Sequence, residues 1–148
     1  MARQSCTGYF IFLNTALINC LSKKQATIEG SVFGAEFVAM KTVVEALRVI
    51  RYKLRMIGVP LTGPTYVYGD NMSVIYNTSR PESTLKKKIN PICYHAVRES
   101  VASGECLTTH CKTGDNYSDM MTKVLYGQKK RDNVYRIIYD MNNYSINS

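Results

Sequence analysis

The sequence predicts an α/β domain in which a mixed β-sheet is flanked by helices. The long segment 31–57 repeats apolar side chains at the three- and four-residue intervals of one helix face. Short apolar or β-branched runs with the length of strands lie on both sides of it. These segments follow one another in the order β-β-α-β-α-α-β-α. A mixture of this kind is typical of a sheet covered by helices.

The first two strands are predicted to form a hairpin. Residues 8–13 (GYFIFL) are apolar and too short for a helix, and residues 16–21 form a second such run. Only Asn14 and Thr15 separate the two runs, as in a tight turn. Both runs are expected to be buried strands, and residues 22–25 are expected to carry the second strand into solvent as a basic, polar end.

A long amphipathic helix is predicted over residues 31–57. Ser31 is the expected N-cap, and Gly58 followed by Pro60 is a stop signal. The buried stripe is expected to hold Phe33, Phe37, Met40, Val44, Leu47, Ile50 and Leu54. The opposite face is expected to hold Lys41, Glu45, Arg48, Arg51 and Arg55. Glu36 lies near the start of the helix, at the edge of the buried stripe.

The second half of the chain supplies the remaining elements. A strand at 65–69 ends at Asp70, and a short helix at 72–77 is capped by Asn71 or Asp70. Residues 84–103 form a second amphipathic segment, interrupted by Pro91. Its inward side chains are expected to be Leu85, Ile89, Ile92, His95, Ala96 and Val97. A strand at 105–111, a turn at 112–114 and a mostly helical segment at 115–142, with a basic bend at 127–131, complete the chain.

Charge and cysteine content narrow the functional classes. The formal charge of +8 favours a polyanionic partner. We expect this partner to be a nucleic acid rather than a membrane, because no apolar run is long enough to span a bilayer and the start of the sequence lacks the features of a signal peptide. Five cysteines without CxxC spacing argue against a disulfide framework and a zinc ribbon. We therefore expect reduced thiols and an intracellular protein, cytoplasmic or nuclear, that is not secreted.

Three carboxylates lie near the ends of predicted helices or strands. Glu36 opens a helix, Asp70 follows a strand, and Asp119 lies early in the last helical segment. Each has an ordinary explanation, as a helix-dipole acid, a turn or cap residue, and a solvated acid. Together they are also the oxygen ligands that Mg²⁺ prefers, and two such ions about 4 Å apart promote phosphodiester hydrolysis. Spacing alone leaves both interpretations open. His95 is expected to be a packed, hydrogen-bonded histidine rather than a proton carrier.

Four segments of the sequence resemble a known family in order and spacing. They are SKKQATIEGSVFGAEFVAM, YVYGDNMSVIYN, KKKINPICYHAVRES and GDNYSDMMTKVL. Together they resemble the ribonuclease H region that closes the polyprotein of Ty1/copia-type LTR retrotransposons, and the resemblance extends from Cys6 to Leu125. It implies a ribonuclease H-like fold, with a core at about 6–125 and a helical extension at about 126–142 within a single domain, 1–148. The implied activity is hydrolysis of the RNA strand of RNA–DNA hybrids with two Mg²⁺ ions, for which Mn²⁺ can substitute.

The resemblance also implies roles for individual residues. Glu36, Asp70 and Asp119 match the second, third and fourth catalytic, metal-binding carboxylates of the family. The first carboxylate belongs to an Asp-x-Asp strand at the centre of the family's sheet, and this sequence has no acid before Glu29. We therefore expect weakened or absent hydrolysis. The alternatives are a non-catalytic nucleic-acid-binding remnant or a degenerate gene fragment.

Partners follow from the same resemblance and from the charge. Contacts to a hybrid or another nucleic acid are expected from Lys23, Lys24, Asn71, Lys86, Lys87 and Lys88. A reverse transcriptase domain precedes this region in the family. A missing central strand would leave strand edges exposed, which favours a homodimer.

Overall fold

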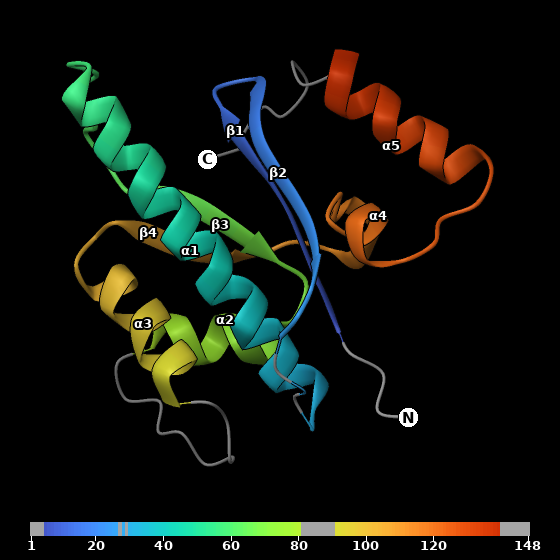
Figure 1. The fold of residues 1–148 in the computed structure, drawn as a ribbon, viewed down its shortest axis with the longest axis horizontal. Helices are drawn as coiled ribbons and strands as arrows, with labels where there is room; N and C mark the ends of the chain where they lie inside the picture. The colour runs from blue at the N-terminus through green and yellow to red at the C-terminus, as the bar shows by residue number, and fades with distance from the viewer. Residues whose placement is uncertain (1–4, 27, 29, 81–90, 140–148) are drawn as a thin grey trace.

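The computed structural model describes residues 5–26, 28, 30–80 and 91–139, and it has the mixed α/β architecture that the sequence predicts (Figure 1). The strands are β1 (Cys6–Leu13), β2 (Ala16–Lys24), β3 (Thr65–Gly69) and β4 (Cys106–His110). The helices are α1 (Val32–Met56), α2 (Met72–Ser79), α3 (Pro91–Ala102), the 3₁₀ turn η1 (Thr113–Asp115), α4 (Asp119–Thr122) and α5 (Gln128–Tyr139).

The described strands form two separate sheets rather than one. β1 and β2 pair in an antiparallel hairpin, with Leu13 opposite Ala16 and Asn14 in the left-handed region at φ 53°. β3 and β4 pair in parallel, with Gly69 opposite His110. The expected mixed sheet is divided because no described strand joins β1 to β3. Each of these two strands therefore has one edge that pairs with no described strand.

Helix α1 joins the two sheets through one hydrophobic core. Tyr9 and Ile11 of β1, Phe37 and Met40 of α1, and Val67 of β3 belong to the same buried cluster. The Phe37 ring is fully buried and lies 5.6 Å from the ring of Tyr94 in α3. Packing into this shared cluster thus fixes the positions of β1 and β3 although they do not pair.

The ends and the buried stripe of α1 are as predicted, with one exception. The Ser31 hydroxyl accepts a hydrogen bond from the Gly34 N–H, and Gly58 follows the helix at φ 81°. Arg51, expected on the solvent face, is buried. Its guanidinium donates to the Gly63 carbonyl at 3.0 Å and to the Thr65 hydroxyl at 2.9 Å. Arg51 therefore ties the last part of α1 to the loop that enters β3.

Two expectations about the hairpin are wrong. β2 is largely exposed rather than buried, and Ile18 retains 43% of its accessible surface. Gln25, expected in solvent, is buried because its side-chain amide donates to the Thr7 hydroxyl at 3.0 Å and to the Ala35 carbonyl at 2.8 Å. Those two bonds tie the end of the hairpin to the start of α1.

The predicted inward face of the second amphipathic segment is also partly wrong. Ile92 and His95 are exposed, and the buried residues are Cys93, Tyr94, Val97 and Ser100. The helix begins at Pro91, and this register places those four residues together on one face. His95 meets the Tyr94 ring edge-on at 5.3 Å but is not packed in the core. Leu85, Ile89 and Lys86 to Lys88 lie outside the described residues.

The last described segment, 115–139, is helical over most of its length, as predicted, but in separate pieces. The segment predicted to be mostly helical forms the η1 turn, the short helix α4 and then α5, which lies on the hairpin side of the molecule (Figure 1). Gly127 turns the chain at φ 64°, and the basic residues after it begin α5 instead of forming a bend. The five cysteines, all within the described residues, form no disulfide.

Candidate functional site

The three predicted carboxylates belong to three different parts of the fold and act on one another electrostatically. Glu36 lies in the first part of α1, Asp70 follows β3, and Asp119 begins α4. The pKa of Glu36 is raised above its ordinary value, chiefly by burial and then by the negative charges of Asp70 and Asp119, while Lys123 acts in the opposite direction. These carboxylates thus share one electrostatic neighbourhood, which we call the acid cluster.

Asp70 is held at the junction of a strand and a helix. The Cys111 N–H donates to the Gly69 carbonyl at 2.9 Å, which extends the pairing of β3 and β4 to the residue before Asp70. Asn71 is the N-cap of α2, and its side-chain oxygen accepts from the N–H groups of Ser73 and Val74. Because Asn71 performs the capping, the Asp70 carboxylate is not required for it.

Asp119 is positioned by the packing of α4 against the hairpin. A β-carbon added at Gly8 of β1 would lie 2.5 Å from Cβ of Met121 and 2.9 Å from Cγ2 of Thr122, so only glycine permits this approach. The Ser22 hydroxyl of β2 donates to the Met121 carbonyl at 2.6 Å. These contacts seat α4 on the two strands and bring Asp119 toward Glu36 and Asp70.

Lys123 is a fourth member of the site that the sequence motifs did not indicate. Its ammonium lies 3.0 Å from Oδ1 of Asp119. The pKa of Lys123 is raised, first by that hydrogen bond, and the charges of Asp119, Asp70 and Glu36 all add to the effect. The signal was a lysine four residues after an acid at the start of a helix, the spacing at which two side chains meet.

The donor chemistry of the acid cluster suits a hard divalent cation. Carboxylate oxygens are the protein ligands of Mg²⁺, and a bound cation would relieve the like-charge repulsion that adds to the effect of burial on the pKa of Glu36. The three carboxylates are farther apart than the ligands of a closed metal site. Among the residues that the structure describes, no three His, Cys, Asp or Glu side chains are grouped closely enough to hold an ion.

The other candidate residues are distributed around this site. Lys23 and Lys24 are exposed at the end of β2, opposite Thr7 and Cys6. Asn71 uses its side-chain oxygen as a helix cap. The hybrid-binding role expected for these residues stays a prediction, as it does for Lys86, Lys87 and Lys88 in the undescribed segment.

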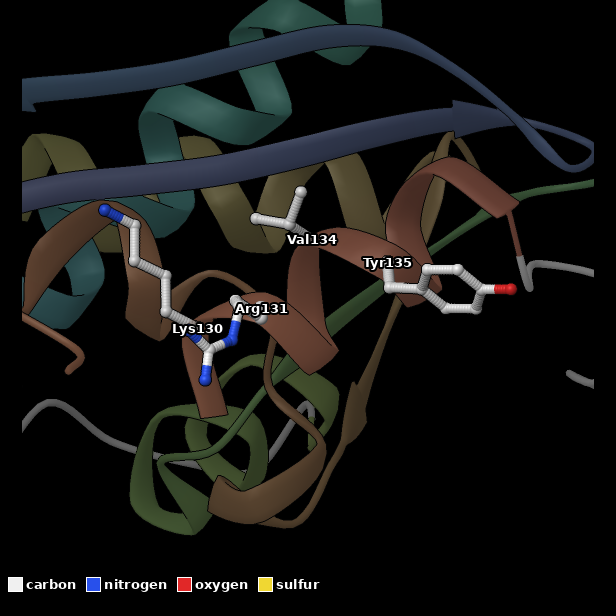
Figure 2. Close-up of a pocket in the computed structure, with 4 residues that line it drawn as sticks. All are labelled: Lys130, Arg131, Val134 and Tyr135. Carbon is white, nitrogen blue, oxygen red and sulfur yellow. The ribbon is translucent and has the colours of Figure 1, made fainter. Parts of the chain in front are cut away.

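A shallow pocket lies apart from the acid cluster, on α5. It has a volume of about 300 Å³ and is lined by Lys130, Arg131, Val134 and Tyr135 (Figure 2). All four residues come from consecutive turns of one helix. With no carboxylate in its lining, this pocket offers nothing to the chemistry of Glu36, Asp70 and Asp119.

Comparison with known proteins supports a retroelement origin. Over 121 residues, 82% of the chain, the sequence is 31% identical to the retrovirus-related Pol polyproteins from transposons RE1 and RE2 of Arabidopsis thaliana. The chain is related to retrotransposon Pol polyproteins. It spans only 8% of the length of each of these two relatives. No protein-family model and no solved structure matches it.

The relationship to Pol polyproteins confirms the retrotransposon part of the sequence-based prediction. The match corresponds to one short segment of each of these two much longer relatives. In the part of the chain that the structure describes, no helix combines the length and apolar character needed to cross a membrane.

Proposed function

We propose that this chain is the ribonuclease H region of a Ty1/copia-type Pol polyprotein and that its substrate is the RNA strand of an RNA–DNA hybrid. The observation that carries the proposal is the shared electrostatic neighbourhood of Glu36, Asp70 and Asp119, each from a different element. The match to Pol polyproteins supports it, because the four motifs of the resemblance lie within a chain related to such proteins.

In this proposal the three carboxylates hold divalent cations for hydrolysis. Bound Mg²⁺ ions supply positive charge that activates a water and stabilises the leaving oxygen of a phosphodiester. Together with the first carboxylate of the family, Glu36 and Asp70 would hold one ion, and Asp119 would help to hold a second. The expected products carry a 5′-phosphate and a 3′-hydroxyl.

The first carboxylate of the family's set belongs to a strand that the described residues do not contain. β1 and β3 each have one edge unpaired by a described strand, and both pack into the core under α1. A preceding Asp-x-Asp strand that pairs there would bring its acid toward Glu36 and Asp70. We therefore expect the present chain to hydrolyse hybrids weakly or not at all, and expect the added strand to increase the rate.

The test compares two forms of the protein on a labelled RNA–DNA hybrid with Mg²⁺. One is the present chain, and the other carries at its start the segment that precedes the match in the RE1 polyprotein. Cleavage by the longer form, abolished by Asp70→Asn but retained in Asp132→Asn, supports the proposal. Asp132 is a suitable control because it lies on α5, where its carboxylate accepts from Gln128. A folded longer form that cuts nothing contradicts it.

A binding module is the second candidate function. The formal charge of +8 and the exposed Lys23 and Lys24 favour attraction to phosphates even without cutting. Hybrid binding that weakens as salt rises, with no cleavage by either form, would favour this function. Absence of both cleavage and binding would favour the degenerate gene fragment.

A further inference from the structure

The pocket on α5 combines two kinds of side chain. Lys130 lies four residues, about one helical turn, before Val134. Arg131 lies at the same distance before the aromatic ring of Tyr135. Figure 2 shows the two cations at one end of the pocket, the tyrosine at the other end and the valine between them. The pocket therefore has a cationic half and an apolar half.

The cationic half of the pocket is not neutralised by the acids that the structure describes. Arg131 donates to Oε1 of Gln128 at 3.1 Å, which is an uncharged partner. Asp132, the one carboxylate of α5, accepts from the Gln128 amide instead of pairing with a cation. On α1, by contrast, Lys41 and Arg48 form ion pairs with glutamates. Within the described part of the chain, the α5 pocket thus keeps an uncompensated positive charge.

The apolar half of the pocket is open to solvent. Tyr135 retains 61% of its accessible surface. Asn133 and Ile137 are buried, and Tyr135 lies two residues from each of them, which places it on the opposite side of the helix. A tyrosine ring presented in this way offers a flat face on which a nucleobase of any kind can stack.

We propose that the α5 pocket is a binding site for single-stranded nucleic acid. Lys130 and Arg131 pair with backbone phosphates, and a base stacks on the ring of Tyr135. A duplex fits less well, because its bases are stacked on one another and do not reach the ring. The cations share the pocket with the ring instead of flanking a broad apolar face, which favours a nucleotide over an anionic membrane surface. The inference goes beyond the proposed function, since the pocket lies apart from the acid cluster.

The first test measures binding of a fluorescein-labelled oligothymidylate by fluorescence anisotropy, in chelator and at several salt concentrations. Replacement of Lys130 and Arg131 by glutamine is expected to lower the slope of log Kd against log salt by about 1.4, since each phosphate contact on a single strand accounts for about 0.7. The matched control replaces Lys129 and Arg136, which are exposed on the same helix but do not line the pocket. It removes the same charge and is expected to change the slope by a smaller amount.

The second test addresses the aromatic ring. Tyr135→Ala is expected to raise Kd about tenfold at every salt concentration, because the stacking of a base is not an ionic contact. Tyr135→Phe keeps the ring and is expected to bind as the wild type does. Since Tyr135 is more than half exposed, neither substitution disturbs the core, and circular dichroism checks that each variant is folded.

The outcomes separate this inference from the proposed function. The inference is wrong if the folded wild type does not bind the oligothymidylate, if the two double variants have the same slope, or if Tyr135→Ala binds as tightly as Tyr135→Phe. It is also wrong if the pocket substitutions abolish binding to phosphatidylserine vesicles and leave oligothymidylate binding intact, because α5 would then be a membrane-binding surface. No arm of these tests uses a metal ion or hybrid cleavage, so the proposed function is tested independently.

Discussion

Gly8 of β1 and Met121 of α4 lie so close that a β-carbon at position 8 would be 2.5 Å from Cβ of Met121. This approach brings a strand near the start of the chain against a helix near its end. Since Asp119 belongs to the same short helix, the glycine determines where that carboxylate lies. The Gly8–Met121 contact therefore connects the packing of the hairpin to the geometry of the acid cluster.

Replacement of Gly8 by alanine is expected to displace α4. The added methyl group meets both Met121 and Thr122, and overpacking of this kind lowers the free energy of unfolding by about 1–3 kcal/mol. Mn²⁺ binding should weaken as well, because Asp119 moves away from Glu36. Gly63→Ala is the control, since a β-carbon there meets nothing within 4 Å. Equal effects of the two substitutions on Mn²⁺ binding would refute the role of Gly8.

The pH dependence of the free energy of unfolding should reveal the raised pKa of Glu36. Its pKa is raised in the folded protein, mainly by burial and by Asp70, so the folded state keeps a proton that the unfolded state has already released. The contribution of this residue to stability is therefore lost as the pH rises from its ordinary value of 4.5 through the raised pKa.

Glu36→Gln should accordingly be more stable than the wild type at neutral pH, and the advantage should disappear as the pH falls to 4.5 and below. Urea unfolding in chelator, at a series of pH values, measures the difference. An advantage that stays constant across this range would show that the substitution acts through packing instead of charge.

Arg51 should stabilise the entry to β3. Arg51→Met removes two hydrogen bonds and leaves the Gly63 carbonyl and Thr65 hydroxyl without this donor, so we expect a loss of about 1–3 kcal/mol in the free energy of unfolding. Arg55→Met, at an exposed position one turn later, should change it by less than about 0.5 kcal/mol. Denaturant titration measures the free energy of unfolding of both variants. Equal losses of this free energy would contradict the structural role of Arg51.

Hybrid binding is expected to depend on Lys23 and Lys24. Replacement of both by glutamine should weaken binding to an RNA–DNA hybrid and reduce the dependence of log Kd on log salt, because fewer counterions are released. The control neutralises Lys53 and Arg55, two exposed residues in the last turn of α1. Fluorescence anisotropy at several salt concentrations gives the slope of log Kd against log salt for each of the two variants. An unchanged slope for the Lys23 and Lys24 variant would place the nucleic acid elsewhere.

Local features of this fold were accessible from sequence because local chemistry determines them. Ser31 and Gly58 mark the ends of α1, and Asn71 caps α2, as their positions predict. Solvent exposure was harder to predict. Arg51 and Gln25 are buried because each meets carbonyl and hydroxyl acceptors distant in sequence, and periodicity contains no information about such partners.

The site was predictable only in part. Resemblance to a family indicated Glu36, Asp70 and Asp119, and these three acids share one electrostatic neighbourhood in the fold. Lys123 was overlooked because a lysine four residues after an acid is common on any helix surface. The electrostatic effects of Glu36 and Asp70 on Lys123 arise only in the tertiary fold, so the sequence does not show them.

The measurement that tests the account most directly is Mn²⁺ binding in four variants of the present chain, each shown to be folded. Glu36→Gln, Asp70→Asn and Asp119→Asn should each weaken binding about tenfold or more, because each removes a ligand from the same site. Asp132→Asn should bind as the wild type does. If only one of the three cluster substitutions affects Mn²⁺ binding, or none does, the three carboxylates do not form one metal site.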